Sequence, residues 1–206
     1  MSRKNLLELK SVNEKYNFTV NLLNPHQNKK EIITLISFVN KIKPKTFCEI
    51  GTACGGTNLL ISQCVESLEK VAGIDLEMRN THKLKYYLNH LNHCYIRSNS
   101  SCLKTLNTIS DFFINDGIDF LFIDGDHTYG GVKKDFELYS PLVNKSGIIA
   151  FHDIIPDFQT KYGKRTGNYA GDVPIFWNEI KKFYRYEEIF ISPKQDGLGI
   201  GILYVD

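Results

Sequence analysis

The sequence contains no pair of cysteines at C-x-x-C spacing and no long apolar run. Its five cysteines are odd in number and stand apart, at positions 48, 54, 64, 94 and 102, which argues against a disulfide framework and a structural zinc site. Apolar stretches such as residues 118–123 fall far short of the roughly 20 residues that a bilayer requires. The first eight residues lack the pattern of a signal peptide. We therefore expect a cytoplasmic protein with buried, reduced thiols and no membrane partner.

The net charge of the chain is also small. The 25 basic and 23 acidic residues leave a formal net charge of +2, which is too small to indicate a nucleic-acid partner. With 42% hydrophobic and 23% charged residues, the composition is that of an ordinary globular protein. A chain of 206 residues is long enough to bury one full core, and it shows no internal repeat.

What the sequence does contain is an alternation of short apolar runs with helical patterns. The apolar runs predict strands at residues 46–50, 71–75, 94–96, 118–123 and 146–151. The run at residues 118–123 is nearly continuous, which is typical of a strand buried on both faces of a parallel sheet. This alternation predicts an α/β fold, an open Rossmann-like sheet with helices on both faces.

The two ends of the chain depart from this alternation. Residues 1–45 show helical patterns only, and we expect them to form an N-terminal helical cap segment within one structural domain. Near the other end, strands are predicted around residues 186–191 and 199–205. Because a parallel crossover needs a dozen or more residues, these two strands must pair as an antiparallel hairpin. The sheet should therefore be parallel with one antiparallel strand.

Polar residues stand at the carboxyl end of all five predicted parallel strands, where open α/β sheets bind ligands. These strand ends carry Glu49 and Gly51, Asp75, residues 98–100, residues 124–127, and His152 with Asp153. One polar strand end is unremarkable, but five in register predict a binding site along this edge.

The first of these strand ends is a glycine-rich turn, Glu49-Ile-Gly-Thr-Ala-Cys-Gly-Gly-Thr57. Glycine lets the backbone approach a ligand closely and adopt positive φ. Gly51 and Gly56 have the spacing of a P-loop, but Thr57 stands where its lysine must be. Ala53 occupies the position of the second glycine in the dinucleotide fingerprint. The turn therefore favours a nucleoside without a pyrophosphate, with a plain tight turn as the alternative.

The next two strand ends also fit a nucleoside. Asp75 lies 24 residues after Gly51, where a carboxylate can accept hydrogen bonds from ribose hydroxyls, although it could equally cap a helix. Asn99 and Ser100 could bind an adenine or serve as another helix cap.

The last two strand ends, Asp124-Gly-Asp-His-Thr-Tyr129 and His152-Asp153, should be neighbours in the sheet. Asp124 and Asp153 would then lie within reach of one ion, and two carboxylates with an imidazole suit Mg²⁺ or Mn²⁺ better than Zn²⁺. Asp-Gly is also ordinary turn chemistry, so these residues could be purely structural. His127 is a candidate general base, since the ordinary imidazole pKa is about 6.5.

These segments resemble class I S-adenosylmethionine-dependent methyltransferases, specifically the methyltransferase domain 24 group. Glu49-Ile-Gly-Thr resembles the first motif of the family, and Gly73-Ile-Asp75 resembles the second. Further similarity to its fourth and fifth motifs and to its C-terminal segments lies at residues 122–135, 147–153, 173–180 and 197–201. The resemblance implies a methyltransferase domain over residues 46–206, with strand order 3-2-1-4-5-7-6 and an antiparallel strand 7.

The activity that the resemblance implies is O-methylation of a small hydroxylated acceptor, with a sugar or an anionic metabolite as candidates, in a protein that could form homo-oligomers. The residues expected to bind the methyl donor are Glu49, Gly51, Thr52, Asp75, Asn99, Ser100 and Asp124. The expected catalytic residues are His127, as base, and Asp124.

Some relatives methylate hydroxyl groups with the help of a divalent ion, held by one aspartate after the fourth strand and an acidic pair after the fifth. Asp124 and Asp153 match this pattern, and His152 replaces one carboxylate of the pair, which should weaken Mg²⁺ and favour Mn²⁺. The expected metal ligands are therefore Asp124, His152 and Asp153. The alternatives are metal-independent methylation with His127 or His152 as base, a nucleoside-binding module without catalysis, and an NAD-dependent oxidoreductase.

Overall fold

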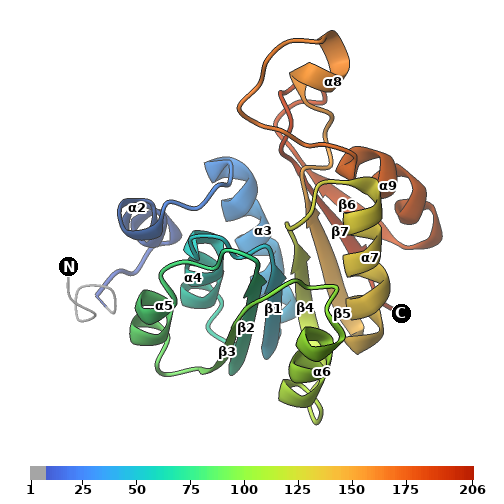
Figure 1. Cartoon of the computed structure of the whole chain (residues 1–206). Helices are drawn as coiled ribbons and strands as arrows, with labels where there is room; N and C mark the ends of the chain where they lie inside the picture. Colours follow the sequence, from blue (N-terminus) through green and yellow to red (C-terminus); the bar gives the residue numbers. More distant parts are fainter. Residues whose placement is uncertain (1–7) are drawn as a thin grey trace.

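The computed structural model describes residues 8–206 and contains one seven-stranded sheet with helices on both faces (Figure 1). The strands are β1 (Thr46–Ile50), β2 (Lys70–Asp75), β3 (Asn92–Arg97), β4 (Ile118–Ile123), β5 (Val143–His152), β6 (Tyr186–Ile189) and β7 (Ile200–Tyr204). They lie in the order β3-β2-β1-β4-β5-β7-β6, with β1 to β5 parallel and β7 antiparallel to both of its neighbours. The predicted strand order and the antiparallel seventh strand are confirmed.

The helices form two layers, one on each face of the sheet. One layer contains α2 (Val12–Leu23), α3 (Lys29–Ile42), α4 (Gly56–Cys64) and α5 (Thr81–Tyr87). The other contains α6 (Leu103–Phe112), α7 (Tyr129–Tyr139) and α9 (Val173–Ile180). The short helix α8 (Phe158–Tyr162) stands beyond the carboxyl ends of the strands, at the top of Figure 1.

The central strands are buried on both faces. Successive residues of a strand point to opposite sides of the sheet. In β1, Phe47 packs beneath α2 to α5, whereas Cys48 and Ile50 pack beneath α6, α7 and α9. All three side chains are almost completely buried. This double burial explains the near-continuous apolar run of β4, since both sets of its alternating side chains face a helical layer.

The N-terminal helices belong to the same core as the sheet. The first, α2, begins with a capping box in which Ser11 and Glu14 satisfy each other's backbone N–H groups. Asn28 caps α3 by accepting the N–H of residue 30. Phe18 and Ile36 are buried in the cluster that contains Phe47 of β1. Residues 24–28, which connect the two helices, are thereby fixed beside the carboxyl edge of the sheet.

Two helices, α6 and α8, were not predicted from the sequence, although Leu106, Ile109 and Phe112 of α6 recur at helical spacing. Among its own residues, α6 buries only Thr105 and Ile109. The five residues of α8 are all at least partly exposed, and the helix forms where the pattern indicates only a polar stretch. Its N-cap is Asp157, whose buried carboxylate accepts the backbone N–H groups of Thr160 and Ala170. The buried carboxylate of Asp157 therefore anchors α8, whereas an apolar stripe anchors the longer helices.

Within residues 8–206, no helix is long and apolar enough to span a membrane. All five cysteines are free. Cys48 and Cys64 are buried, Cys54 and Cys94 are half-buried, and Cys102 is exposed, so the expectation of buried thiols holds for two of them.

Gly201 in β7 provides a test of the packing between the sheet and α9. A Cβ atom at this position would lie 2.5–2.7 Å from the buried indole ring of Trp177. We expect Gly201→Ala to lower the free energy of unfolding by about 1–3 kcal/mol, because overpacking forces a rigid ring to move. Chemical denaturation measures this change. The matched control is Gly130→Ala, where nothing lies within 4 Å of the new atom and no loss is expected.

Candidate active site

The glycine turn after β1 brings three strand ends together. Gly51 has φ of +90° and donates its N–H to the carbonyl of Ile74 at the end of β2, over 2.8 Å. A Cβ atom on Gly51 would lie 1.9 Å from the carbonyl oxygen of Asp124, which follows β4. Only glycine can occupy this position, because both the backbone conformation and the close approach exclude a side chain.

Two cavities open on either side of this turn and meet at Gly51, Ala53 and Asp124. The first, which we name the Asp75 cavity, has a volume of about 430 Å³ and lies along the ends of β2 and β3. The second, the histidine cavity, has a volume of about 490 Å³. Its walls include residues 24–28, His127 after β4, His152 at the end of β5, and residues 167–169. The N-terminal helical region and the long connection after β5 thus both contribute to the histidine cavity.

Asp75 lines its cavity and also organises the turn. One carboxylate oxygen accepts the N–H of Ala53 at 2.8 Å, and the other accepts the N–H of Glu77 at 2.7 Å. A carboxylate offers about four acceptor positions, so each oxygen keeps capacity for a ligand hydroxyl. Asp75 does not cap a helix, since α5 begins at Thr81 with Asn80 as its N-cap. Its two backbone contacts leave room for the expected ribose hydrogen bonds.

At the far end of the Asp75 cavity, Asn99 and Ser100 have different roles. The Asn99 side chain accepts the N–H of Ser101 at 2.7 Å, so it caps its own turn. The Ser100 hydroxyl donates to Asp135 of α7 at 2.5 Å. Asp135 is 1% exposed, and burial raises the pKa of its carboxyl group to about 6. In the sequence, Asp135 could have been recognised as a carboxylate among the apolar residues on the buried face of α7.

Glu49 lies beneath the turn. Its place in the glycine-rich motif predicts a contact with the methyl donor, but the residue is fully buried and lines neither cavity. Both carboxylate oxygens lack a hydrogen-bond partner. Burial and then the charge of Asp124 raise the pKa of Glu49 to about 8. Thr52, in contrast, lines the histidine cavity.

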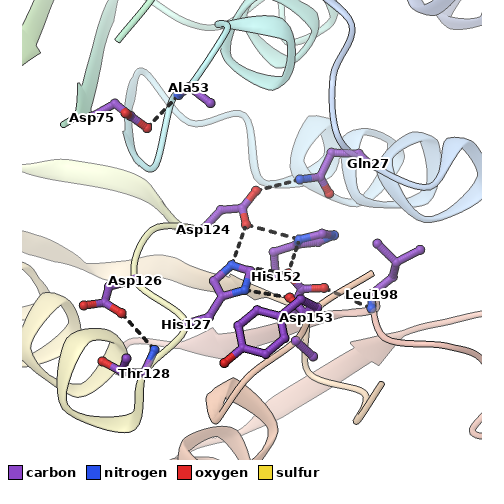
Figure 2. A network of polar contacts seen from close by, with 12 residues as sticks. Gln27, Ala53, Asp75, Asp124, Asp126, His127, Thr128, His152, Asp153 and Leu198 are labelled. Atoms are coloured by element: carbon purple, nitrogen blue, oxygen red, sulfur yellow. Dashed lines mark hydrogen bonds and ion pairs between the residues drawn. The ribbon is translucent and has the colours of Figure 1, made fainter. Parts of the chain in front are cut away.

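Two aspartates and two histidines converge in the histidine cavity (Figure 2). The Nδ1 atom of His152 lies 3.2 Å from an oxygen of Asp124 and 3.1 Å from an oxygen of Asp153. The Nε2 atom of His127 lies 3.4 Å from Asp153 and 3.8 Å from Asp124. All four residues were candidates from the sequence, and the structure brings them to one point.

The environment of Asp124 favours its charged form. Burial raises the pKa of this carboxyl group, but His152 and His127 outweigh burial and hold it at about 2. Gln27 donates its amide N–H to the second Asp124 oxygen at 2.8 Å, and Figure 2 shows it across Asp124 from the histidines. Gln27 was not found from the sequence, because it lies 97 positions before Asp124 in a connection without a recognisable motif.

A backbone contact fixes the tautomer of His127. Its Nδ1 atom lies 2.8 Å from the carbonyl oxygen of Tyr169, and a carbonyl can only accept, so Nδ1 carries a hydrogen and donates it. The Nε2 atom is left facing the aspartates. The Asp124 carboxylate is the main cause of a raised His127 pKa, with Asp153 contributing further. His127 is therefore oriented as a proton-binding group toward the cavity.

The donor set of this cluster fits a divalent cation. One ligand atom from each of Asp124, His152 and Asp153 lies within 4.8 Å of the others. His152 is 4% exposed, and its Nε2 atom is buried without a partner. Asp153 has φ of +61° and is held in this strained conformation by accepting the N–H of Leu198 at 3.0 Å. Two carboxylate oxygens with one imidazole suit Mn²⁺ better than Mg²⁺.

Comparison with known protein families identifies the domain that carries these two cavities. A family model described as a methyltransferase domain, Methyltransf_24, matches residues 48–154, more than half of the chain. The chain belongs to this family. Within it, the open sheet with strand order 3-2-1-4-5-7-6 is that of the class I S-adenosylmethionine-dependent methyltransferases.

Curated proteins that are similar to this chain match only part of it. Uncharacterized protein R132 of Acanthamoeba polyphaga mimivirus is 36% identical over 118 residues, which cover 52% of this chain and 51% of that protein. The chain thus matches about half the length of this curated relative.

Solved structures share the fold over almost the whole chain. An O-methyltransferase from Bacillus cereus in complex with SAH has a TM-score of 0.65 and 16% identity, covering 98% of this chain and 94% of that one. The MycE methyltransferase of the mycinamycin biosynthetic pathway, in complex with Mg, SAH and mycinamycin VI, has a TM-score of 0.64 and 13% identity. That match covers 96% of this chain and 55% of MycE.

The burial of Glu49 predicts a pH-dependent stability. A carboxyl group whose pKa rises from 4.5 to about 8 on folding destabilises the native state progressively as the pH rises through that window. Glu49→Gln should therefore stabilise the protein by about 1–3 kcal/mol above pH 8, because it removes a buried charge without partners, and by much less near pH 4.5. Urea unfolding at both ends of the window measures the difference. The exposed Glu66→Gln should give the same small change at each pH, and a pH-independent effect of Glu49→Gln would contradict the assignment.

Proposed function

We propose that this methyltransferase domain transfers the methyl group of S-adenosylmethionine to a hydroxyl group of a small acceptor. The observation that carries the proposal is the position of the His127 Nε2 atom. It faces Asp124 and Asp153 in a cavity that shares Asp124 and Gly51 with the Asp75 cavity. His127 thus lies beside the border of the Asp75 cavity, where the proposed reaction requires donor and acceptor to come together.

The donor is assigned to the Asp75 cavity and to the turn beside it. Asp75 accepts hydrogen bonds from the ribose hydroxyls, and residues 98–101 border the adenine. The Gly51 turn lets the backbone approach the rest of the donor, which reaches the border of the two cavities near Thr52. Glu49, buried beneath the turn, makes no direct contact with the donor.

Methyl transfer from a sulfonium is an in-line displacement, so most of the rate enhancement comes from alignment of donor and acceptor. His127 removes the proton of the acceptor hydroxyl at Nε2, while its Nδ1–H remains bonded to Tyr169. Asp153, 3.4 Å from Nε2, stabilises the imidazolium that results. Gln27 and His152 hold the Asp124 carboxylate between the two cavities.

The lining of the histidine cavity favours a neutral, hydroxylated acceptor such as a sugar. Its polar side chains are mainly amides, a phenol and imidazoles, including Asn24, Gln27, Asn28, Asn168 and Tyr169. Among the described residues that line it, none is a lysine or an arginine. Amides donate and accept hydrogen bonds in equal measure, as a polyhydroxylated molecule requires, whereas an anionic metabolite would call for a cation.

Asp124, His152 and Asp153 would hold a divalent ion if the enzyme uses one. Such an ion, when bound, lowers the pKa of a hydroxyl group that coordinates to it. The competing account needs no metal. In it, the His152 imidazolium already balances the two carboxylates, because burial lowers the pKa of His152 but Asp124 and Asp153 raise it well above its ordinary value.

Donor binding can be measured without knowing the acceptor. We expect S-adenosylhomocysteine to bind in the micromolar range, about −8 kcal/mol, by calorimetry. Asp75→Ala should weaken binding by about 1.5–3 kcal/mol, because it removes a charged acceptor of two ribose hydrogen bonds. The control is Glu77→Ala, an exposed carboxylate in the same turn, which should leave affinity unchanged. Absence of binding to the wild-type protein would refute the assignment of donor and cavity together.

Metal binding can be tested independently of activity. Electron paramagnetic resonance of Mn²⁺ titrated with the protein should show a bound ion, and Asp153→Asn should weaken it at least about tenfold. Asparagine tolerates the positive φ at this position, so the fold is preserved. Asp126→Asn, an exposed carboxylate near Asp124, is the control. No bound Mn²⁺ at millimolar concentration would instead support the imidazolium account.

A further inference from the structure

Asp157 is a fully buried carboxylate that the proposed reaction does not use. It precedes α8 and lines neither cavity. Its Oδ1 atom accepts the N–H of Thr160 at 2.7 Å, as an N-cap does, whereas its Oδ2 atom accepts the N–H of Ala170 at 2.8 Å, 13 positions along the chain. Burial raises the pKa of Asp157, but these N–H groups outweigh burial and lower it below its ordinary value, so the carboxylate is charged. The helix cap explains only the first of the two bonds.

The N–H of Ala170 belongs to the same peptide group as the carbonyl of Tyr169. That carbonyl oxygen lies 2.8 Å from Nδ1 of His127 and accepts its hydrogen. The peptide group is planar and trans, so its N–H and C=O point in opposite directions. One rigid unit therefore joins the Asp157 carboxylate, on one side, to the His127 ring on the other.

The residues that follow this peptide group pack against the backbone of His127. The N–H of Asp172 donates to the His127 carbonyl oxygen over 2.8 Å, and a Cβ atom on Gly171 would lie 2.4 Å from that oxygen. Ala170 is fully buried, so water cannot take the place of the Asp157 oxygen at its N–H. Within this segment, the hydrogen bond to Asp157 is the contact that orients the peptide group itself.

We propose that Asp157 is a positioning residue for His127 and acts through the peptide group between Tyr169 and Ala170. It holds the Tyr169 carbonyl where that carbonyl keeps a hydrogen on Nδ1, which leaves Nε2 free for the acceptor hydroxyl. The inference rests on the proposed function, in which Nε2 of His127 removes the acceptor proton. Because hydrogen bonds in a chain polarise one another, the charge of Asp157 also strengthens the bond between Tyr169 and His127.

NMR spectroscopy of the imidazole nitrogens and backbone amides tests this chain of hydrogen bonds. Serine is a good N-cap with a single side-chain oxygen, so Asp157→Ser keeps the cap of α8 and loses the bond to Ala170. The Ala170 amide and the Nδ1–H of His127 should then exchange with solvent about tenfold faster, as expected for the loss of one hydrogen bond. The neutral ring of His127 should change from the Nδ1–H tautomer to a mixture of both. Absence from the spectrum of His127→Asn identifies its signals.

The matched control is Asp196→Ser, which loosens the same connection elsewhere. The Asp196 carboxylate accepts the N–H of Phe158 at 2.6 Å and the hydroxyl hydrogen of Thr166 at 2.7 Å, both away from residues 169–170. If Asp157 were merely structural, the two variants would affect His127 alike. We expect Asp196→Ser to keep the wild-type tautomer and Nδ1–H exchange. An equal change in both variants, or an unchanged tautomer in Asp157→Ser, overturns the inference.

A variant of the same size covers the case in which Asp157→Ser does not unfold cooperatively. Asp157→Asn retains one acceptor oxygen, which can serve either Thr160 or Ala170, and amide exchange shows which bond survives. The His127 tautomer must follow Ala170, as wild type where that amide stays protected and mixed where it does not, and any other combination overturns the inference.

Calorimetry with S-adenosylhomocysteine separates this inference from the proposed function. All these Asp157 and Asp196 variants should bind it with the wild-type affinity, since neither residue lines the Asp75 cavity. Failure of the wild-type protein to bind it refutes the proposed function, whatever the tautomer of His127. Normal binding, with a tautomer that does not depend on Asp157, refutes the role of Asp157 alone.

Discussion

The contact between Gly51 and the backbone of Asp124 is the constraint on which the rest of the site depends. With no side chain at residue 51, the turn after β1 packs directly onto the end of β4, and both cavities are bounded by that contact. Asp124 therefore belongs to two walls at once. Its backbone closes the glycine turn, and its carboxylate faces the two histidines. In the proposed function, the distance between the donor nucleoside and His127 is thereby set by close main-chain packing.

The carboxylates at this edge differ mainly in their partners. Asp124 has two imidazoles and an amide around it, and its pKa is about 2. Glu49 and Asp135 each carry at least one buried oxygen without a partner, and burial raises their pKa values to about 8 and about 6. Unpaired buried groups of this kind destabilise a protein and persist at sites that bind ligands. The unpaired carboxylates at this sheet edge therefore lower the stability of the domain, and they lie where a polar ligand is expected to bind.

Much of the fold could be predicted from the sequence, because strands, glycine turns and polar strand ends are local features. The strand order was implied by the resemblance to a methyltransferase family, whereas the convergence of Asp124, Asp153 and the two histidines followed from motifs at the ends of strands expected to be neighbours. Gln27 and Tyr169 could not be found in this way, since each reaches the site from a connection far away in the chain. Glu49 shows the opposite limit. Its motif is recognisable, but the alternation of side chains along β1 directs it beneath the turn rather than into a cavity.

The two walls of the histidine cavity lie outside the segment that defines the family. The family model matches residues 48–154, which contain the glycine turn, Asp75 and all four converging residues. Residues 24–28 and 167–169, which face those residues across the cavity, lie before and after it. These connections can vary in sequence without disturbing the strands that carry the reactive groups. In the proposed function, acceptor choice and donor binding therefore depend on separate stretches of the chain, and one can diverge in evolution while the other stays fixed.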